Sequence, residues 1–341
     1  MKQDKAPDGD YLWDGSGEPD PGVVRLEQLL ARYRHRGTPP SLPRRETSPR
    51  RFAAQAALQI LVTAASLLLV AAAAWFAHAV RPAGWTVQSL AGAPTVAGAP
   101  IDGPARLPVG ETMITDAASR ARMDVGSIGV VDVEPNSRVR LLASRLGQHR
   151  MALDRGRIRA LIWAPPRLFF VNTPSSTAID LGCAYTLDVD DRGWGHLVVE
   201  SGWVAFQHGG RESFIPQGAI CATRPGVGPG TPCYADAAPA IPEALTILDF
   251  APTQDVRREA ALRTVLTLAR RKDALTLWHL LSRGTPAERA QVYDRLASLV
   301  PPPDGVTREA VLGGKRRALD AWWDALGLDS VTWWRIWKRT W

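Results

Sequence analysis

The side chains that most enzymes and metal sites need are scarce in this 341-residue chain, which has three cysteines and six histidines. It contains no G-x-S-x-G, H-E-x-x-H or Walker A pattern and no pair of C-x-x-C motifs. Those patterns place a nucleophile, two zinc ligands, a phosphate cradle or four thiolates as their chemistry requires. The sequence therefore predicts a protein that is not an enzyme and that has no cofactor or metal ion.

Cys183, His196 and Asp180 are the one set that could be drawn as a catalytic triad. A reactive thiolate is favoured at an electropositive helix start, where the pKa of the thiol is lowered. Cys183 falls inside an expected strand instead. We therefore predict that the set is not catalytic.

Charged side chains are absent from residues 52–80, between Arg51 and Arg81. The core of this stretch, 58–76, would span roughly 28 Å as a helix, close to the thickness of a bilayer's hydrocarbon layer. The sequence predicts a single transmembrane helix over 52–80. The alternatives are a buried helix of a soluble domain and a cleaved signal peptide ending at Ala77-His78-Ala79. About fifty residues precede the stretch, which favours an uncleaved anchor.

Positive charge is distributed unevenly around that stretch. Arginines such as Arg44, Arg45 and Arg50 precede it, whereas Arg81 is the only nearby cation that follows it. This asymmetry predicts a cytoplasmic N-terminus, with the rest of the chain on the other side. The net charge of +7 is explained by this cluster and by scattered arginines. No direct binding to nucleic acid is expected.

Residues 1–51 are expected to be a cytoplasmic stub with one amphipathic helix over 21–36 and a basic linker. Asp20 is a suitable helix cap, and Pro21 suits the first helical position. Apolar residues then recur at helical spacing, and four of them are candidate partner-binding residues: Val23, Leu26, Leu29 and Leu30. A lone helix needs a partner for its apolar face, either a bilayer surface or a groove in a cytoplasmic protein.

Short runs of alternating apolar and polar residues fill 85–224, separated by turn signals such as Asp154-Arg155-Gly156. About ten short strands with no helical stretch between them predict an antiparallel all-β domain, as a sandwich, a roll or a β-helix-like stack. Cys221 and Cys233 flank a Gly/Pro-rich loop. They are expected either to form a disulfide in an oxidising compartment or to remain free thiols.

A linker is expected over 225–252, followed by a small α-helical, HEAT-like domain over 253–341. Thr285-Pro286 with Glu288 has the form of a helix start. Three tryptophans near the C-terminus, Trp333, Trp334 and Trp337, lie among cations. They are candidate partner-binding residues, and a packed helix or a membrane-resting helix would suit them equally. The fold class is therefore α+β and multidomain.

The order of motifs in 85–225 resembles the FecR family. A Thr-Pro dipeptide leads into a strand, a Gly-x-x-aromatic step follows, and a hairpin with the pattern V-x-x-G-x-V comes next. The residues that carry the resemblance are Thr173, Pro174, Asp180, Gly182, Tyr185, Gly202 and Val204. We interpret them as structural residues rather than ligand contacts.

The resemblance implies a single-pass regulator in the bacterial inner membrane, with its C-terminal domains in the periplasm. Such proteins sense an outer-membrane receptor or another periplasmic protein, and they control an extracytoplasmic-function sigma factor through their cytoplasmic part. The alternative is a membrane-anchored periplasmic scaffold of the cell envelope without sigma-factor control.

Overall fold

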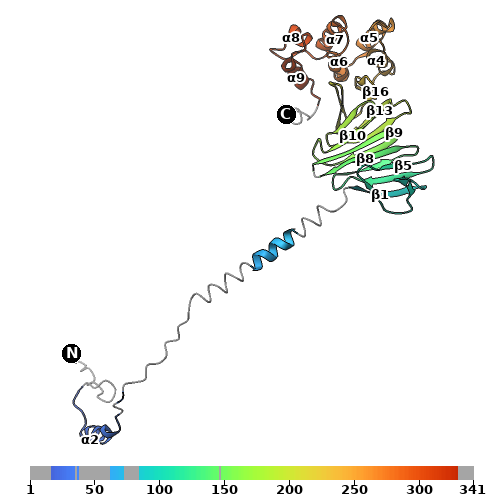
Figure 1. The fold of residues 1–341 in the computed structure, drawn as a ribbon. Helices are drawn as coiled ribbons and strands as arrows, with labels where there is room; N and C mark the ends of the chain where they lie inside the picture. The colour runs from blue at the N-terminus through green and yellow to red at the C-terminus, as the bar shows by residue number, and fades with distance from the viewer. Residues whose placement is uncertain (1–16, 35–36, 38–61, 73–83, 146, 329–341) are drawn as a thin grey trace. The chain divides into compact units, whose positions relative to one another are not determined.

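The computed structural model describes residues 17–34, 37, 62–72, 84–145 and 147–328 (Figure 1). The chain divides into two compact units, 1–79 and 80–341. The first contains the described helices near the N-terminus. The second contains a large β region followed by a helical region.

Unit one contains helix α2 (Pro21–Leu30), which continues as the 3₁₀ turn η1 (Ala31–Tyr33). Asp20 caps α2, because its Oδ1 accepts a hydrogen bond of 2.7 Å from the amide of Gly22. The expected cap at Asp20 and the proline at the helix start are confirmed. No residue of α2 is buried.

The predicted transmembrane helix over 52–80 is contradicted by the structure. Only residues 62–72 of that stretch are described, and the remainder lies outside the described residues. Residues 62–72 are helical, and at 1.5 Å per residue they extend roughly 16 Å, about half of a bilayer's apolar thickness. None of the helices in the described ranges combines the length and the apolar character that a membrane crossing requires.

The β region has 18 described strands that form one continuous, bent sheet resembling a half-barrel. Every pairing between them is antiparallel except that of β9 with β10. The strands are β1 (Gly84–Ala91), β2 (Thr95–Val96), β3 (Ala99–Pro100), β4 (Ala105–Pro108), β5 (Thr112–Ile114), β6 (Arg120–Asp124), β7 (Gly129–Val133), β8 (Arg138–Arg145), β9 (Gln148–Ile162), β10 (Phe169–Asn172), β11 (Thr177–Asp180), β12 (Ala184–Val189), β13 (Gly195–Ser201), β14 (Trp203–His208), β15 (Arg211–Pro216), β16 (Ala219–Arg224), β17 (Gly228–Pro229) and β18 (Cys233–Tyr234).

The strands lie in two layers that share β9. Layer one runs β4–β1–β6–β7–β9–β12–β13–β16, with β17 and β18 beside β16. Layer two runs β3–β2–β5–β8–β9–β10–β11–β14–β15. Trp85 of layer one lies 6.1 Å from Phe169 of layer two, ring centroid to centroid. The buried apolar side chains of both layers therefore form one core.

Gly156 is the corner at which β9 passes from one layer to the other. Residues before it pair with β8 and β10, and Gly156 and the residues after it pair with β7 and β12. Its φ of +95° is unfavourable for any residue with a Cβ. A Cβ there would also lie 2.2 Å from Oγ of Ser137 and 2.4 Å from its Cα. The turn predicted at 154–156 is thus a bend inside one long strand.

Cross-strand ion pairs cover the outer surface of layer one. Arg122 on β6 lies 2.6 Å from Asp132 on β7, and Arg159 on β9 lies 2.6 Å from Glu200 on β13. These pairs are largely exposed, so each contributes little to stability. They keep this face charged and hydrated while the inner face is apolar.

The helical region contains the helices α4 (Ala240–Phe250), α5 (Arg257–Leu268), α6 (Ala274–Leu280), α7 (Pro286–Leu299), α8 (Arg308–Leu312) and α9 (Arg316–Ala325), with the 3₁₀ turn η2 (Arg271–Asp273). The helix start expected at Thr285-Pro286 with Glu288 is confirmed, because Thr285 and Glu288 form a capping box in which each side chain bonds to the other residue's backbone amide. The expected linker over 225–252 differs from the structure. Residues 225–252 form β17, β18 and α4 instead of a linker. Their Gly/Pro-rich start pairs with β16, and their apolar end packs on α5.

Arg283 joins the helical region to the β region. Its guanidinium is buried and donates to Asp249 Oδ1 at 3.1 Å, to Thr231 Oγ1 at 2.8 Å and to Ser213 Oγ at 2.7 Å. It also donates to the carbonyl of Glu212 at 3.2 Å. Because the carboxylate of Asp249 and this cation are both removed from water, each depends on the other for its charge to be tolerated.

His279 of α6 makes a second connection, at strand β15. Its Nε2 accepts a hydrogen bond of 3.0 Å from the amide of Phe214, and its Nδ1 lies 2.8 Å from the carbonyl of Leu275. This pattern requires the neutral imidazole with its proton on Nδ1. Burial is the main reason that the pKa of His279 falls to about 3. Beside His279, the ring of Trp323 packs against two other rings. Its centroid lies 5.7 Å from that of Phe214 and 4.5 Å from that of Trp278.

We predict that Gly156→Ala destabilises the β region by at least about 3 kcal/mol, because an unfavourable φ is combined with overlap against backbone atoms of Ser137. Gly110→Ala is the matched control. Gly110 has a φ of +96°, and apart from its two chain neighbours no described residue has an atom within 4 Å of the place that a Cβ would take there. Only the conformational cost of about 1–2 kcal/mol therefore remains. Urea unfolding measures both, and equal losses would contradict the corner assignment.

We predict that Arg283→Met costs about 3–5 kcal/mol of unfolding free energy, because it removes the cation that lies 3.1 Å from the buried carboxylate of Asp249 and leaves Arg211 at 3.9 Å. The control is Arg257→Met, which breaks the ion pair with Asp255 in which the arginine is 66% exposed. That change is expected to leave the unfolding midpoint nearly unchanged. A similar midpoint for both variants would show that the buried pair does not hold the two regions together.

Candidate functional site

The motif residues that carry the FecR resemblance lie where β10 to β14 cross between the layers. Thr173 and Pro174 form the turn between β10 and β11. The Oγ1 of Thr173 accepts hydrogen bonds from the amides of Ser176, at 3.0 Å, and Ser175, at 3.3 Å. These bonds satisfy backbone donors that no strand partner reaches.

Asp180 and Cys183 are in direct contact inside the protein. Asp180 is 1% exposed, and its carboxylate accepts from the amide of Gly182 and from the thiol of Cys183, each at 2.7 Å. Burial raises the pKa of Asp180 to about 7, and hydrogen bonds from Cys183 and Gly182 oppose the rise. Burial likewise raises the pKa of Cys183 well above its usual range.

Gly202 is required by the close approach of two backbones. Its φ is +71°, and a Cβ there would lie 2.1 Å from the carbonyl oxygen of Gly182. Tyr185 and Val204 on the adjoining strands are fully buried. At these positions the motif residues fix the backbone and fill the core.

His196 does not join the Asp180–Cys183 pair. It is exposed on β13, where its register partner is Asp188. The thiol of Cys183 is buried with a raised pKa, which is the opposite of what a nucleophile needs. The three residues therefore do not form a triad.

Cys221 and Cys233 are both buried free thiols in the structure. The register explains why they do not bond. Cys233 pairs with Ile220, so its side chain shares a face with Ile220, and Cys221 points to the opposite face. Cys221 accordingly packs in the core of the β region and Cys233 in that of the helices.

The candidate partner-binding residues divide into two groups. In α2, Leu26, Leu29 and Leu30 are 58%, 52% and 56% exposed, whereas Val23 is half-buried. Trp333, Trp334 and Trp337 lie outside the described residues. The apolar stripe of α2 is therefore the part of this prediction that has a described geometry.

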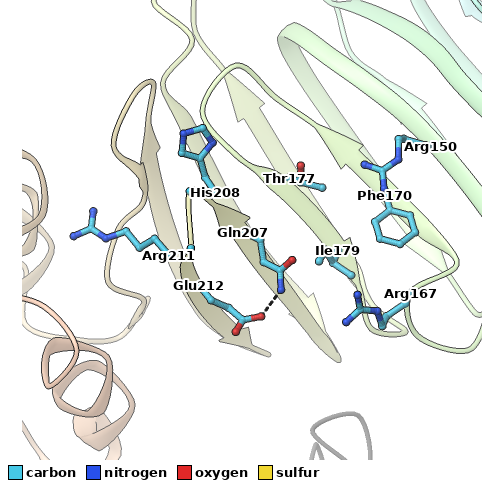
Figure 2. Close-up of a pocket in the computed structure, with 11 residues that line it drawn as sticks. Arg150, Arg167, Phe170, Thr177, Ile179, Gln207, His208, Arg211 and Glu212 are labelled. Carbon is cyan, nitrogen blue, oxygen red and sulfur yellow. Dashed lines mark hydrogen bonds between the residues drawn. The ribbon is translucent and has the colours of Figure 1, made fainter. Parts of the chain in front are cut away.

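An open pocket of about 580 Å³ lies on the outer surface of layer two (Figure 2). Its floor is Phe170 on β10 and Ile179 on β11, which are register partners. Figure 2 shows Arg150 and Arg167 on opposite sides of the Phe170 ring. The guanidinium carbon of Arg150 lies 4.4 Å from the centre of that ring.

The far side of this pocket is polar and carries a negative charge. The amide of Gln207 on β14 donates to the carboxylate of Glu212 on β15. Arg211 contributes to the lining, but Figure 2 shows its guanidinium turned away, and it lies 3.9 Å from Asp249. Two arginines and one carboxylate thus face the cavity, together with His208 at its rim.

Sequence reasoning missed this pocket. Arg150 and Phe170 are twenty positions apart, and only the parallel pairing of β9 with β10 makes them neighbours. The one available signal was that Arg150 and Arg167 are cations beside apolar strand residues.

We predict that Asp180→Asn changes how stability depends on pH. In the wild type the pKa of Asp180 is about 7 in the folded state against 3.8 for an ordinary carboxyl. A carboxyl whose pKa is raised by folding stabilises the folded state fully below about pH 4. This contribution to the unfolding free energy is lost as the pH rises through about 7, at up to about 1.4 kcal/mol per pH unit. Asparagine resembles the protonated carboxyl and cannot ionise.

From about pH 4 to 7 the wild type should therefore lose unfolding free energy that Asp180→Asn keeps. The stability of the variant relative to wild type should rise over this range. Urea unfolding across this range measures it. Asp102→Asn, at an exposed position of the same region, should keep the wild-type pH profile. Parallel profiles for wild type and Asp180→Asn would contradict the raised pKa.

No protein-family model matches the chain, and no curated protein is similar to it in sequence. The resemblance to the FecR family is therefore not confirmed and stays a prediction. Two crystal structures, at 1.65 and 2.50 Å resolution, are weakly similar in fold, and both are described as "a putative anti-sigma factor" from Parabacteroides distasonis ATCC 8503. Each has 11% identity and a TM-score of 0.30 over 34% of this chain and 56% of theirs. The match thus spans about half of that protein's length and is too weak to assign a function.

Proposed function

We propose that this protein is a regulatory binding protein, not an enzyme, and that α2 binds a cytoplasmic partner of the extracytoplasmic-function sigma factor class. The observation that carries the proposal is the apolar stripe of α2 and η1. Leu26, Leu29 and Leu30 are each more than half exposed, and Tyr33 is 75% exposed. Such a stripe at helical spacing is what a groove in a partner protein accepts.

The length of α2 supports a need for a partner. It has ten residues followed by one 3₁₀ turn, and isolated helices shorter than about 12–15 residues are marginal in water. Burying one leucine side chain contributes about 1.5–3 kcal/mol. Three leucines on one face therefore offer enough free energy for specific binding.

The charges beside the stripe favour an acidic rim on the partner's groove. Arg25 lies on α2, and Arg32 and Arg34 lie at its C-terminal end. The guanidinium of Arg32 lies 5.4 Å from the ring centre of Tyr33, so a cation is already placed beside the apolar face. Complementary charge would accelerate association and favour the correct partner.

The test uses the purified full chain and each sigma factor of the host, with binding measured by calorimetry. We predict saturable binding to one of them and a loss of at least about hundredfold in affinity for the double variant Leu26→Asp/Leu30→Asp. Gln28→Asp adds one negative charge on the opposite face of α2 and should change affinity little. Absence of binding to every sigma factor, or equal binding by the double variant, would overturn the proposal.

A further inference from the structure

We infer that the pocket on the outer surface of layer two is a binding site for a small organic oxyanion, with a carboxylate or phosphoryl group attracted by the positive charges of Arg150 and Arg167 and an apolar body over Ile179. This site is separate from the α2 stripe. The inference depends on the geometry of two arginines whose hydrogen-bonding capacity is only partly used.

Arg150 is held in place without being neutralised. Its guanidinium stacks on Phe170, and its Nη1 donates to Asn172 Oδ1 at 2.8 Å. A guanidinium has five N–H donors, and among the described residues this is the one side-chain bond of Arg150. Its partner is a neutral amide, and within the described ranges no carboxylate forms an ion pair with it. Burial lowers the pKa of Arg150, which agrees with a cation that lacks compensation.

Arg167 occupies an unfavourable backbone conformation at the pocket edge. Its φ is +67°, in the left-handed region that few residues other than glycine adopt. The amide of Arg167 donates to the carbonyl of Asp180 at 2.9 Å, which fixes this conformation. Within the described part of the chain its guanidinium has no ion pair or side-chain hydrogen bond. Strain of this kind is concentrated at binding sites.

The floor and the far side of the pocket determine the size and polarity of the ligand. Phe170 and Ile179 provide an apolar floor, and a cavity of about 580 Å³ is within the usual size for small molecules. Glu212 lies on the far side and is bonded to Gln207. Its negative charge directs an oxyanion toward the two arginines, while the apolar body of the ligand occupies the floor between them and Gln207.

Binding can be measured with three probes that share a phenyl ring: benzoate, phenyl phosphate and the neutral benzamide. Calorimetry on the full chain at constant ionic strength should show saturable binding of at least one anion and none of benzamide. The anion that binds more tightly identifies the carboxylate or the phosphoryl group as the preferred one.

Arg167→Gln should weaken anion binding at least about tenfold, because a charge-assisted hydrogen bond is lost. Arg150→Gln should do the same, although it also removes the packing on Phe170. The thermal midpoint of Arg167→Gln should match wild type, which separates loss of binding from loss of folding. Arg192→Gln removes an exposed arginine at the β12–β13 turn and should leave the affinity within about twofold.

Three results would overturn the inference. The first is no saturable binding of either anion up to about 10 mM. The second is binding of benzamide as tight as that of benzoate, which would show that charge is not recognised. The third is unchanged anion binding in both Arg150→Gln and Arg167→Gln, which would place the anion elsewhere.

Discussion

The whole β region depends on the bend of β9 at Gly156. Because a single strand belongs to both layers, the pairing of β7, β8, β10 and β12 is fixed relative to one another through it. Ser137 occupies the space that a side chain at the bend would need, and its Oγ accepts from the amide of Arg157 at 2.9 Å. The missing Cβ therefore sets the distance between the layers, and with it the shape of the common core.

The local pattern of the sequence predicted strands better than it predicted their connections. The alternation that predicted strands within 85–224 corresponds to strands such as β9 and β14, because side chains on a pleated strand alternate between core and solvent. Asp154-Arg155-Gly156 has the composition of a turn, and nothing local distinguishes a turn from a bend between two layers. The uncharged stretch 52–80 similarly carries a strong compositional signal, yet the part of the chain that the structure describes holds no helix able to span a membrane.

The candidate sites show the same division between local and long-range information. Thr173, Gly182 and Gly202 could be identified as structural, since a turn and two positive φ angles depend on neighbours in sequence. The separation of Cys221 from Cys233 depends on the register of β16 with β18, which a count of residues does not reveal. The pocket on the outer surface of layer two is lined by residues from five strands. Its existence depends on the register of those strands, so it could not be predicted from the sequence.

The hydrogen bond from the amide of Phe214 to His279 has a further consequence for the β region as a whole. β15 pairs with β14 on one side and is the last strand of its layer, so its remaining amides would be open to another chain. Exposed strand borders of this kind template self-association. A side chain of α6 accepts a hydrogen bond from one such amide and aromatic rings surround it, so the helices leave less of this strand edge open for pairing with another molecule.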